Sequence, residues 1–269
     1  MELKELRMPV SNEADEMRSM LLEAIATADD ALMEKYFAGE EFTPEEIIEG
    51  LKKGVTAGEI CPVFAGVQQT GAAVPLMVDT LLQILPSAAD AVCRFEDGEE
   101  KAFDENGENA LFVFKTIADP FVGKLSYFRV LSGKIKNDTR LINNRTGAEE
   151  RLSKIMWLKG GKQEDAGEII AGDIGSVSKL GNVLTGDTLS VSGKLAAAAV
   201  DFPAPTISVA VYPKAKGDEE KITQAFSRLC EEDPTIKVYT DNETHEQILS
   251  ALGEQHIDVI ISRLKSKFG

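Results

Sequence analysis

A series of short β-forming segments, separated by turn residues, occupies the middle of the sequence. Residues 110–117 and 124–131 are rich in β-formers, and a turn is expected between them at Asp119-Pro120. Further short runs follow at residues 139–142, 151–158, 173–179 and 187–189. Short strands at this spacing, with Gly, Asn, Asp and Pro between them, are typical of a small antiparallel barrel. We therefore predict a closed antiparallel β-barrel in this region.

The first 90 residues have helical periodicity instead. Apolar residues at three- and four-residue steps predict one amphipathic helix over residues 12–38. Thr43, Pro44 and Glu46 form a capping-box pattern that predicts the start of a second helix, ending at Gly54. A third helix is expected at residues 74–85, and residues 60–64 have strand character.

Two segments have the composition of connections. In residues 87–108, seven acidic residues lie between Glu96 and Glu108, which predicts a solvated loop. Residues 192–205 contain small residues and two prolines, as a linker does. Beyond residue 205 the pattern is strand, helix, strand, strand, helix. That order is a ferredoxin-like split βαβ unit without its last strand.

Composition limits the classes of function. The chain has 269 residues and a net charge of -16, which argues against non-specific adhesion to nucleic acid but leaves local basic patches open. Cys61, Cys93 and Cys230 have no metal-ligand spacing, so we expect three reduced thiols and no metal site. We find neither a signal peptide nor an apolar run of membrane-spanning length, and we expect a cytoplasmic monomer with no membrane contact.

Several stretches of the sequence resemble parts of one known protein family. The barrel region contains FKTIADPFVGKLSYFRVLSGKI, AGDI and TGDTL, which resemble the second domain of the elongation factor G family of translational GTPases. The C-terminal region contains FPAPTISVAVYPKAKGDEEKI and LGEQHIDVIISRLKSKF, which resemble its third domain. The N-terminal region contains ICPVFAGVQQTGAAVPLMVDTLLQILPSA, which is similar to the end of the family's GTPase region.

The resemblance implies a multidomain α+β fold. Residues 1–90 would be a mostly helical C-terminal remnant of an α/β GTPase domain. Residues 91–195 would be the translation-factor-type antiparallel barrel, and residues 203–269 a ferredoxin-like βαββα domain that lacks its last strand.

The function implied is that of a fragment of a ribosome-dependent GTPase that promotes tRNA and mRNA translocation. Its partners would be small-subunit ribosomal RNA, ribosomal protein, and the GTPase and C-terminal domains of the parent. Three alternatives stay open: a ribosomal-protection GTPase fragment of the tetracycline-resistance type, a non-enzymatic ribosome- or RNA-binding adaptor, and a small hydrolase on the ferredoxin-like unit.

The residues that bind nucleotide in such a GTPase are missing. Each Gly-Lys pair is followed by Leu, Ile or Gln, so no GxxxxGK[ST] phosphate loop is present. Where the family's last guanine-binding loop reads Gly-Ser-Ala, this chain has Ala65-Gly66-Val67, a degenerate remnant at most. We therefore expect GTP and Mg²⁺ as cofactors of the parent alone, and this chain to be inactive by itself, with no catalytic residue.

Basic residues gather in one part of the barrel region of an otherwise acidic protein. They could position phosphate groups without reading a base sequence. The competing interpretation is solubilising charge on exposed strand edges. The ribosome- or RNA-binding candidates are Lys134, Lys136, Arg140, Arg145, Arg151 and Lys154.

Overall fold

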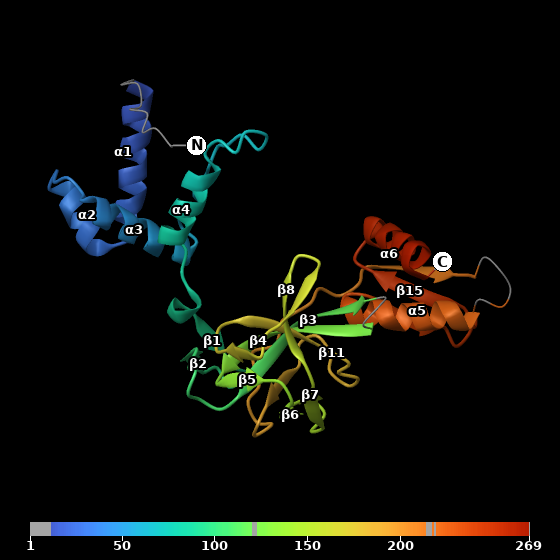
Figure 1. The fold of residues 1–269 in the computed structure, drawn as a ribbon. Coiled ribbons are helices and arrows are strands. Elements are labelled where there is room, and N and C mark those ends of the chain that lie inside the picture. The colour runs from blue at the N-terminus through green and yellow to red at the C-terminus, as the bar shows by residue number, and fades with distance from the viewer. Residues whose placement is uncertain (1–11, 120–122, 214–216, 218, 269) are drawn as a thin grey trace. The chain divides into compact units, whose positions relative to one another are not determined.

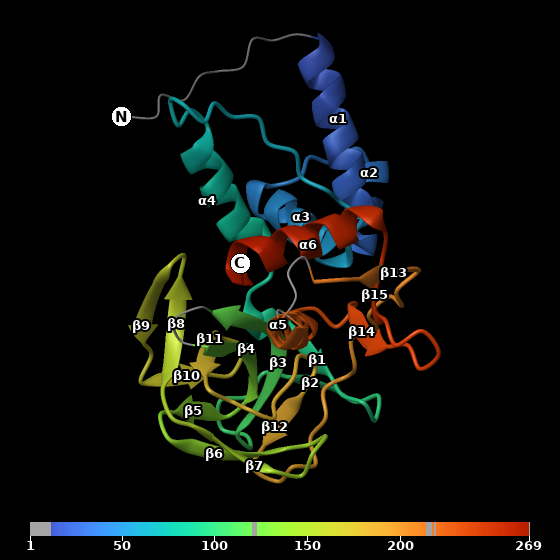
Figure 2. The same ribbon diagram turned by 90° about the vertical axis from the view of Figure 1, so that its right-hand side faces the viewer.

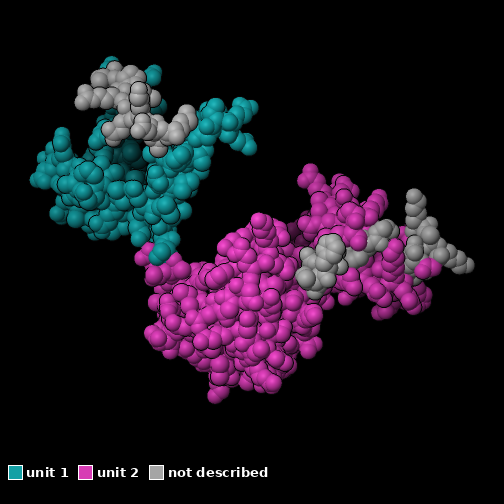
Figure 3. Space-filling model, viewed as in Figure 1, with its two compact units in different colours: residues 1–87 teal, residues 88–269 magenta. Residues whose placement is uncertain are grey.

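The computed structural model describes residues 12–119, 123–213, 217 and 219–268. The chain forms two compact units, residues 1–87 and residues 88–269, which Figure 3 shows in different colours. The expected domain boundaries at residues 90/91 and 195/203 stay predictions. Pro120, in the turn expected at Asp119-Pro120, lies outside the described residues.

The first unit consists of helices. They are α1 (Asn12–Thr27), α2 (Asp30–Phe37), α3 (Pro44–Ala57) and α4 (Val74–Ile84). The prediction of one helix over residues 12–38 is wrong, because the Asp29 side chain accepts hydrogen bonds from the backbone N–H groups of Ala31 and Leu32 and caps a new helix. None of the helices in the described part of the chain combines the length and apolar character that a membrane span requires.

Helix α3 begins at the predicted capping box and ends later than predicted. Thr43 accepts from the Glu46 N–H, and the Glu46 carboxylate accepts from the Thr43 N–H. Gly54 lies inside the helix, where its bare Cα makes room for Ile60: a Cβ there would lie 2.4 Å from an Ile60 methyl. The actual C-cap is Gly58, which adopts a left-handed φ of 76°. Residues 60–64 do not form the expected strand.

The barrel region of the second unit is an antiparallel sheet (Figure 1). Its strands are β3 (Ala110–Asp119), β4 (Gly123–Ser132), β5 (Lys134–Lys136), β6 (Thr139–Asn143), β7 (Glu149–Leu152), β8 (Ile155–Lys159), β9 (Lys162–Asp165), β10 (Glu168–Ile170), β11 (Ile174–Ser178) and β12 (Thr188–Ser190). Eight of them follow the order β7-β6-β12-β3-β4-β11-β8-β9, and β5 pairs with β10 separately.

The sheet curls without closing. Its core draws buried apolar residues from nearly every strand, including Leu111, Phe128, Leu141 and Ile155, so the sheet wraps around one cluster (Figure 2). Among the described residues, the outer strands β7 and β9 do not pair with each other. The expectation of a closed barrel is therefore corrected to a curled half-barrel.

The acidic segment before the barrel is ordered. It contains the short helix η1 (Ala88–Asp90) and the antiparallel pair β1 (Val92–Arg94) and β2 (Glu100–Ala102), where we expected a solvated loop. The predicted linker pairs with this hairpin: the Glu96 N–H donates to the Ala196 carbonyl, and Ala198 donates to Arg94. Phe95 and Ala197 belong to a small core of their own. The segment is ordered because apolar residues between its acidic residues, such as Phe95, are buried in this core.

The C-terminal region packs two helices against a three-stranded sheet. Its elements are β13 (Ile207–Val211), α5 (Glu219–Glu232), β14 (Lys237–Thr240), β15 (Gln247–Ala251) and α6 (Glu254–Phe268). The strand order β13-β15-β14 places the first strand beside the third, as in a split βαβ unit. Its separate core includes Phe226, Leu249 and Ile260, and β13 is an edge strand.

Candidate functional site

All six basic candidates in the barrel region contact a carboxylate. The pairs are Lys134–Glu105 at 3.0 Å, Lys136–Glu168 at 3.1 Å, Arg140–Glu149 at 2.8 Å, Arg145–Asp187 at 2.7 Å, Arg151–Asp138 at 2.6 Å and Lys154–Asp165 at 3.3 Å. The residues therefore do not form a cluster of unpaired positive charge. Exposed ion pairs contribute only about 0–1 kcal/mol each, so such cations can exchange a carboxylate for a phosphate at small cost.

Arg140 and Arg151 are the two candidates that the fold brings closest together. They lie directly opposite each other in the β6–β7 ladder. Like charges at such a position repel, and each arginine is balanced by its own carboxylate, Glu149 for Arg140 and Asp138 for Arg151. Both guanidinium groups are more than half exposed. Their carboxylate partners come from opposite ends of this pair of strands, so the two arginines form two separate exposed ion pairs.

The three candidate lysines belong to other elements than this pair. Lys134 and Lys136 belong to β5, and Lys136 faces its partner Glu168 across the β5–β10 ladder. Lys154 lies between β7 and β8, and its partner Asp165 also accepts from the Asn137 side chain. Sequence proximity alone had placed these lysines in one group with the arginines.

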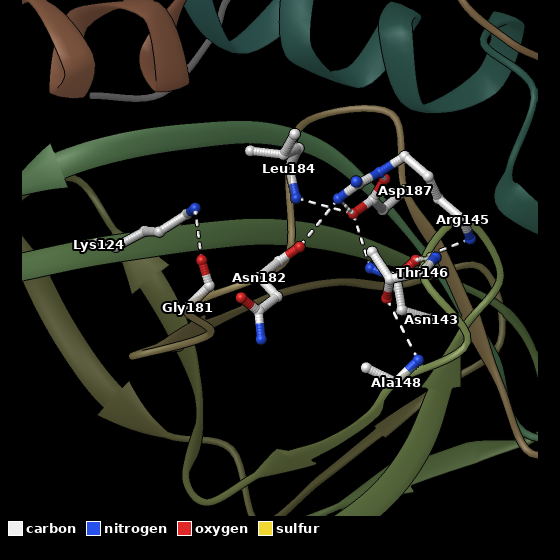
Figure 4. A network of polar contacts seen from close by, with 9 residues as sticks. All are labelled: Lys124, Asn143, Arg145, Thr146, Ala148, Gly181, Asn182, Leu184 and Asp187. Carbon is white, nitrogen blue, oxygen red and sulfur yellow. Dashed lines mark hydrogen bonds and ion pairs between the residues drawn. The ribbon is translucent and has the colours of Figure 1, made fainter.

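Arg145 has a structural role that the sequence did not reveal (Figure 4). It lies in the turn between β6 and β7, where its Nε donates to Asp187 Oδ1 at 2.7 Å and its Nη2 to Asp187 Oδ2 at 2.9 Å. The same Nη2 donates to the Asn182 carbonyl at 2.9 Å. Three of its five N–H donors are thus occupied by one carboxylate and one carbonyl, so Arg145 is held in place and is a poorer candidate for binding phosphate than Arg140 or Arg151.

Asp187 is the centre of that network. The residue is 4% exposed, and its Oδ2 also accepts from the Asn143 side chain at 2.7 Å and from the Leu184 N–H at 2.8 Å. Burial raises the pKa of Asp187, but the hydrogen bonds from Arg145, Leu184 and Asn143 outweigh it and hold the pKa below its usual value. One sequence signal pointed toward this residue, its place in TGDTL just before a strand.

A groove of about 510 Å³ lies on the barrel beside Trp157. Tyr127, Leu158 and Ile174 line it, and Lys159 Nζ lies 6.0 Å from the centre of the Trp157 ring. Trp157 also packs against the barrel core. Glu164 holds Lys159 at 2.7 Å, and Asp173 lines the same groove, so this surface has no excess of positive charge.

Residues 65–67, where we expected at most a degenerate remnant of a guanine loop, take part in a turn closed by a backbone hydrogen bond. The Val67 N–H donates to the Ala72 carbonyl at 3.1 Å. A Cβ on Gly66 would lie 3.1 Å from the same carbonyl oxygen, so the loop closes tightly on itself. In the described residues, no group of three or more His, Cys, Asp and Glu side chains is arranged to hold a metal ion.

Comparison with known proteins gives two family matches in chain order. Residues 108–192 match Elongation factor G domain 2, and residues 202–269 match Elongation Factor G, domain III. The chain belongs to the elongation factor G family. A crystal structure of a protein from Thermus thermophilus is similar, with 29% sequence identity and a TM-score of 0.74, over 97% of this chain.

Membership in the elongation factor G family makes this protein a translation factor of that type, related to protein biosynthesis. The curled sheet is its second domain and the βαββα unit its third. The chain spans 38% of the length of the Thermus thermophilus protein.

Proposed function

We propose that this chain supplies ribosome contact and interdomain coupling to a translational GTPase that moves tRNA and mRNA in the cytoplasm. The observation that carries the proposal is the succession of the second and third domains in one chain. The partners are small-subunit ribosomal RNA and ribosomal protein, and the protein acts as a monomer. The helical first unit is the end of the GTPase region.

The residues present do not fit the nucleotide that the family implies. The sequence has no phosphate loop, and the Val67 N–H, which lies where the family's guanine loop would be, is bonded to Ala72. GTP and Mg²⁺ are therefore assigned to the GTPase region of a longer parent, and no chemical step is assigned to this chain.

Arg140 and Arg151 are the residues we assign to ribosomal RNA. The two residues are directly paired in the β6–β7 ladder, their side chains are exposed, and each is held only by an exposed carboxylate. Guanidinium binds phosphate through two parallel N–H donors, which suits it to an RNA backbone. Arg145 is left out of this assignment because Asp187 holds it.

The test is co-sedimentation with small ribosomal subunits at low and rising salt. The double variant Arg140→Glu and Arg151→Glu should pellet less at low salt, and its salt dependence should be shallower by about 0.7–0.9 for each phosphate that is no longer bound. The matched control is Arg94→Glu with Lys101→Glu, because these exposed residues of the β1–β2 hairpin are also ion-paired, with Glu100 and Glu99. If both double variants weaken binding equally, net charge rather than a site explains the effect. If neither does, the arginines are solvated surface.

A further inference from the structure

The barrel and the third domain have separate cores that share no residue. The barrel core contains Phe128 and Ile155, and the third-domain core contains Phe226 and Leu249. The two domains meet where the C-terminal end of α5 lies against β3. Glu231 and Glu232 of α5 make hydrogen bonds and an ion pair across this contact, which we call the joint.

Glu232 is the buried residue of this joint. Its side chain is about one-twentieth exposed, and its Oε1 accepts from the backbone N–H of Ala118 in β3 at 2.7 Å. The same oxygen accepts from Lys267 Nζ of α6 at 2.9 Å, and Arg263 lies 4.0 Å from the other oxygen. One carboxylate therefore binds the barrel backbone on one side and the cations of its own domain on the other.

Lysines of the barrel complete the joint. Lys115 Nζ donates to the main-chain carbonyl of Glu232 at 2.8 Å, where α5 ends. A cation at a helix C-terminus satisfies a free carbonyl and interacts favourably with the helix dipole. Lys124 of β4 forms an ion pair with Glu231 at 3.0 Å.

We infer that Glu232 is the positioning residue that sets the orientation of the third domain on the barrel. This inference rests on the proposed function, in which the chain couples domains, and it names the residue through which the coupling passes. The buried carboxylate is costly to leave unpaired. Lys267 and Arg263 of α6 hold it within the third domain. Its hydrogen bond from the Ala118 N–H of β3 is the contact that favours one arrangement of the two domains. Removing the carboxylate leaves the Ala118 N–H and Lys267 without their acceptor and frees the joint.

Residual dipolar couplings of the ¹⁵N-labelled full chain test this directly, because they report the orientation of each domain separately. In the wild-type protein, one alignment tensor should fit the amides of both the barrel and the third domain. In Glu232→Ala, two tensors of different magnitude should be needed, while the amides of each core keep their chemical shifts. Glu232→Gln keeps an oxygen that can accept from Ala118 but removes the charge, so it should give an intermediate result.

Further variants separate positioning from simple stability. Lys115→Met removes a hydrogen bond across the joint from the barrel side, so two alignment tensors should again be needed to fit the two domains. Lys267→Met removes an ion pair within the third domain and should lower its stability with a single tensor retained. Asp258→Ala is the matched control, because it removes an exposed carboxylate of α6 away from the joint.

A single shared tensor in a folded Glu232→Ala variant would overturn the inference. If Glu232→Ala unfolds the third domain, Lys115→Met and Glu232→Gln decide, since both leave the packing of α5 and α6 in place. The measurement uses the free chain, so a failure to bind ribosomes would refute the proposed function without affecting this result.

Discussion

Arg145 and Asp187 join the turn between β6 and β7 to the loop before β12 through two parallel hydrogen bonds of 2.7 and 2.9 Å. The two residues are far apart in the sequence, and the fold brings them together through the pairing of β12 with β6. Asp187 also accepts from Asn143 at the end of β6. The carboxylate thus holds together the end of β6, the β6–β7 turn and the loop before β12. The positive charge of Arg145 is neutralised by Asp187 within the protein.

The first prediction concerns the removal of that carboxylate. Asp187→Asn replaces one accepting oxygen with an NH₂ group that faces the donors of Arg145, Asn143 and Leu184. Losing hydrogen bonds to a charged, buried acceptor should lower the free energy of unfolding of the barrel by about 1–3 kcal/mol. Urea denaturation followed by Trp157 fluorescence measures it. The control Asp138→Asn breaks only the exposed pair with Arg151 and should cost about 0–1 kcal/mol. Equal decreases in unfolding free energy for Asp187→Asn and Asp138→Asn would contradict a structural role for Asp187.

The second prediction is the pH dependence of the same contribution. The pKa of Asp187 is lowered in the folded protein, because the hydrogen bonds outweigh the effect of burial. A lowered folded-state pKa gives stability that is fully present above the unfolded-state pKa of about 3.9 and is lost as the pH falls through the folded-state value. The difference in unfolding free energy between wild type and Asp187→Asn should therefore be constant near neutral pH and shrink below about pH 4. A difference that stays constant through the acid range would contradict this assignment.

The fold was predictable where local chemistry decides it. The capping box at Thr43 and Glu46 determines the start of α3, and alternating apolar residues mark β13. The errors came from positions where packing or a single side chain overrides periodicity. Asp29 caps a new helix within an unbroken apolar pattern, and α3 continues past Gly54 to a left-handed C-cap at Gly58. Closure of the barrel depends on pairing between distant strands, which no local pattern records.

The candidate site was predictable only as a set of residues. The sequence showed that basic residues gather between Lys134 and Lys154, and the structure shows that every one of the six candidates has a carboxylate partner. Asp187 comes from far along the chain, so no spacing rule connects it with Arg145. The joint at Glu232 was missed for the same reason, because its partner Ala118 contributes only a backbone N–H.

The third prediction is that this chain does not bind GTP or GDP. It rests on the missing phosphate loop and on the Val67 N–H, which is bonded to Ala72. Calorimetric titration with either nucleotide and Mg²⁺ should give no saturable heat. A micromolar dissociation constant would contradict the prediction and would favour a nucleotide site that the motif search missed.

The last prediction concerns β13, the edge strand of the third domain. Residues Ile207–Val211 contain no charged residue and no proline, which are the features that usually protect an edge from pairing with another chain. Amides of β13 that face away from β15 should exchange with deuterium faster than amides of β4, a strand paired on both sides. Their protection should rise with protein concentration as molecules pair along this edge, and Ser208→Lys should abolish that rise. Protection equal to that of β4 in a demonstrated monomer would mean that another segment of the chain covers the edge.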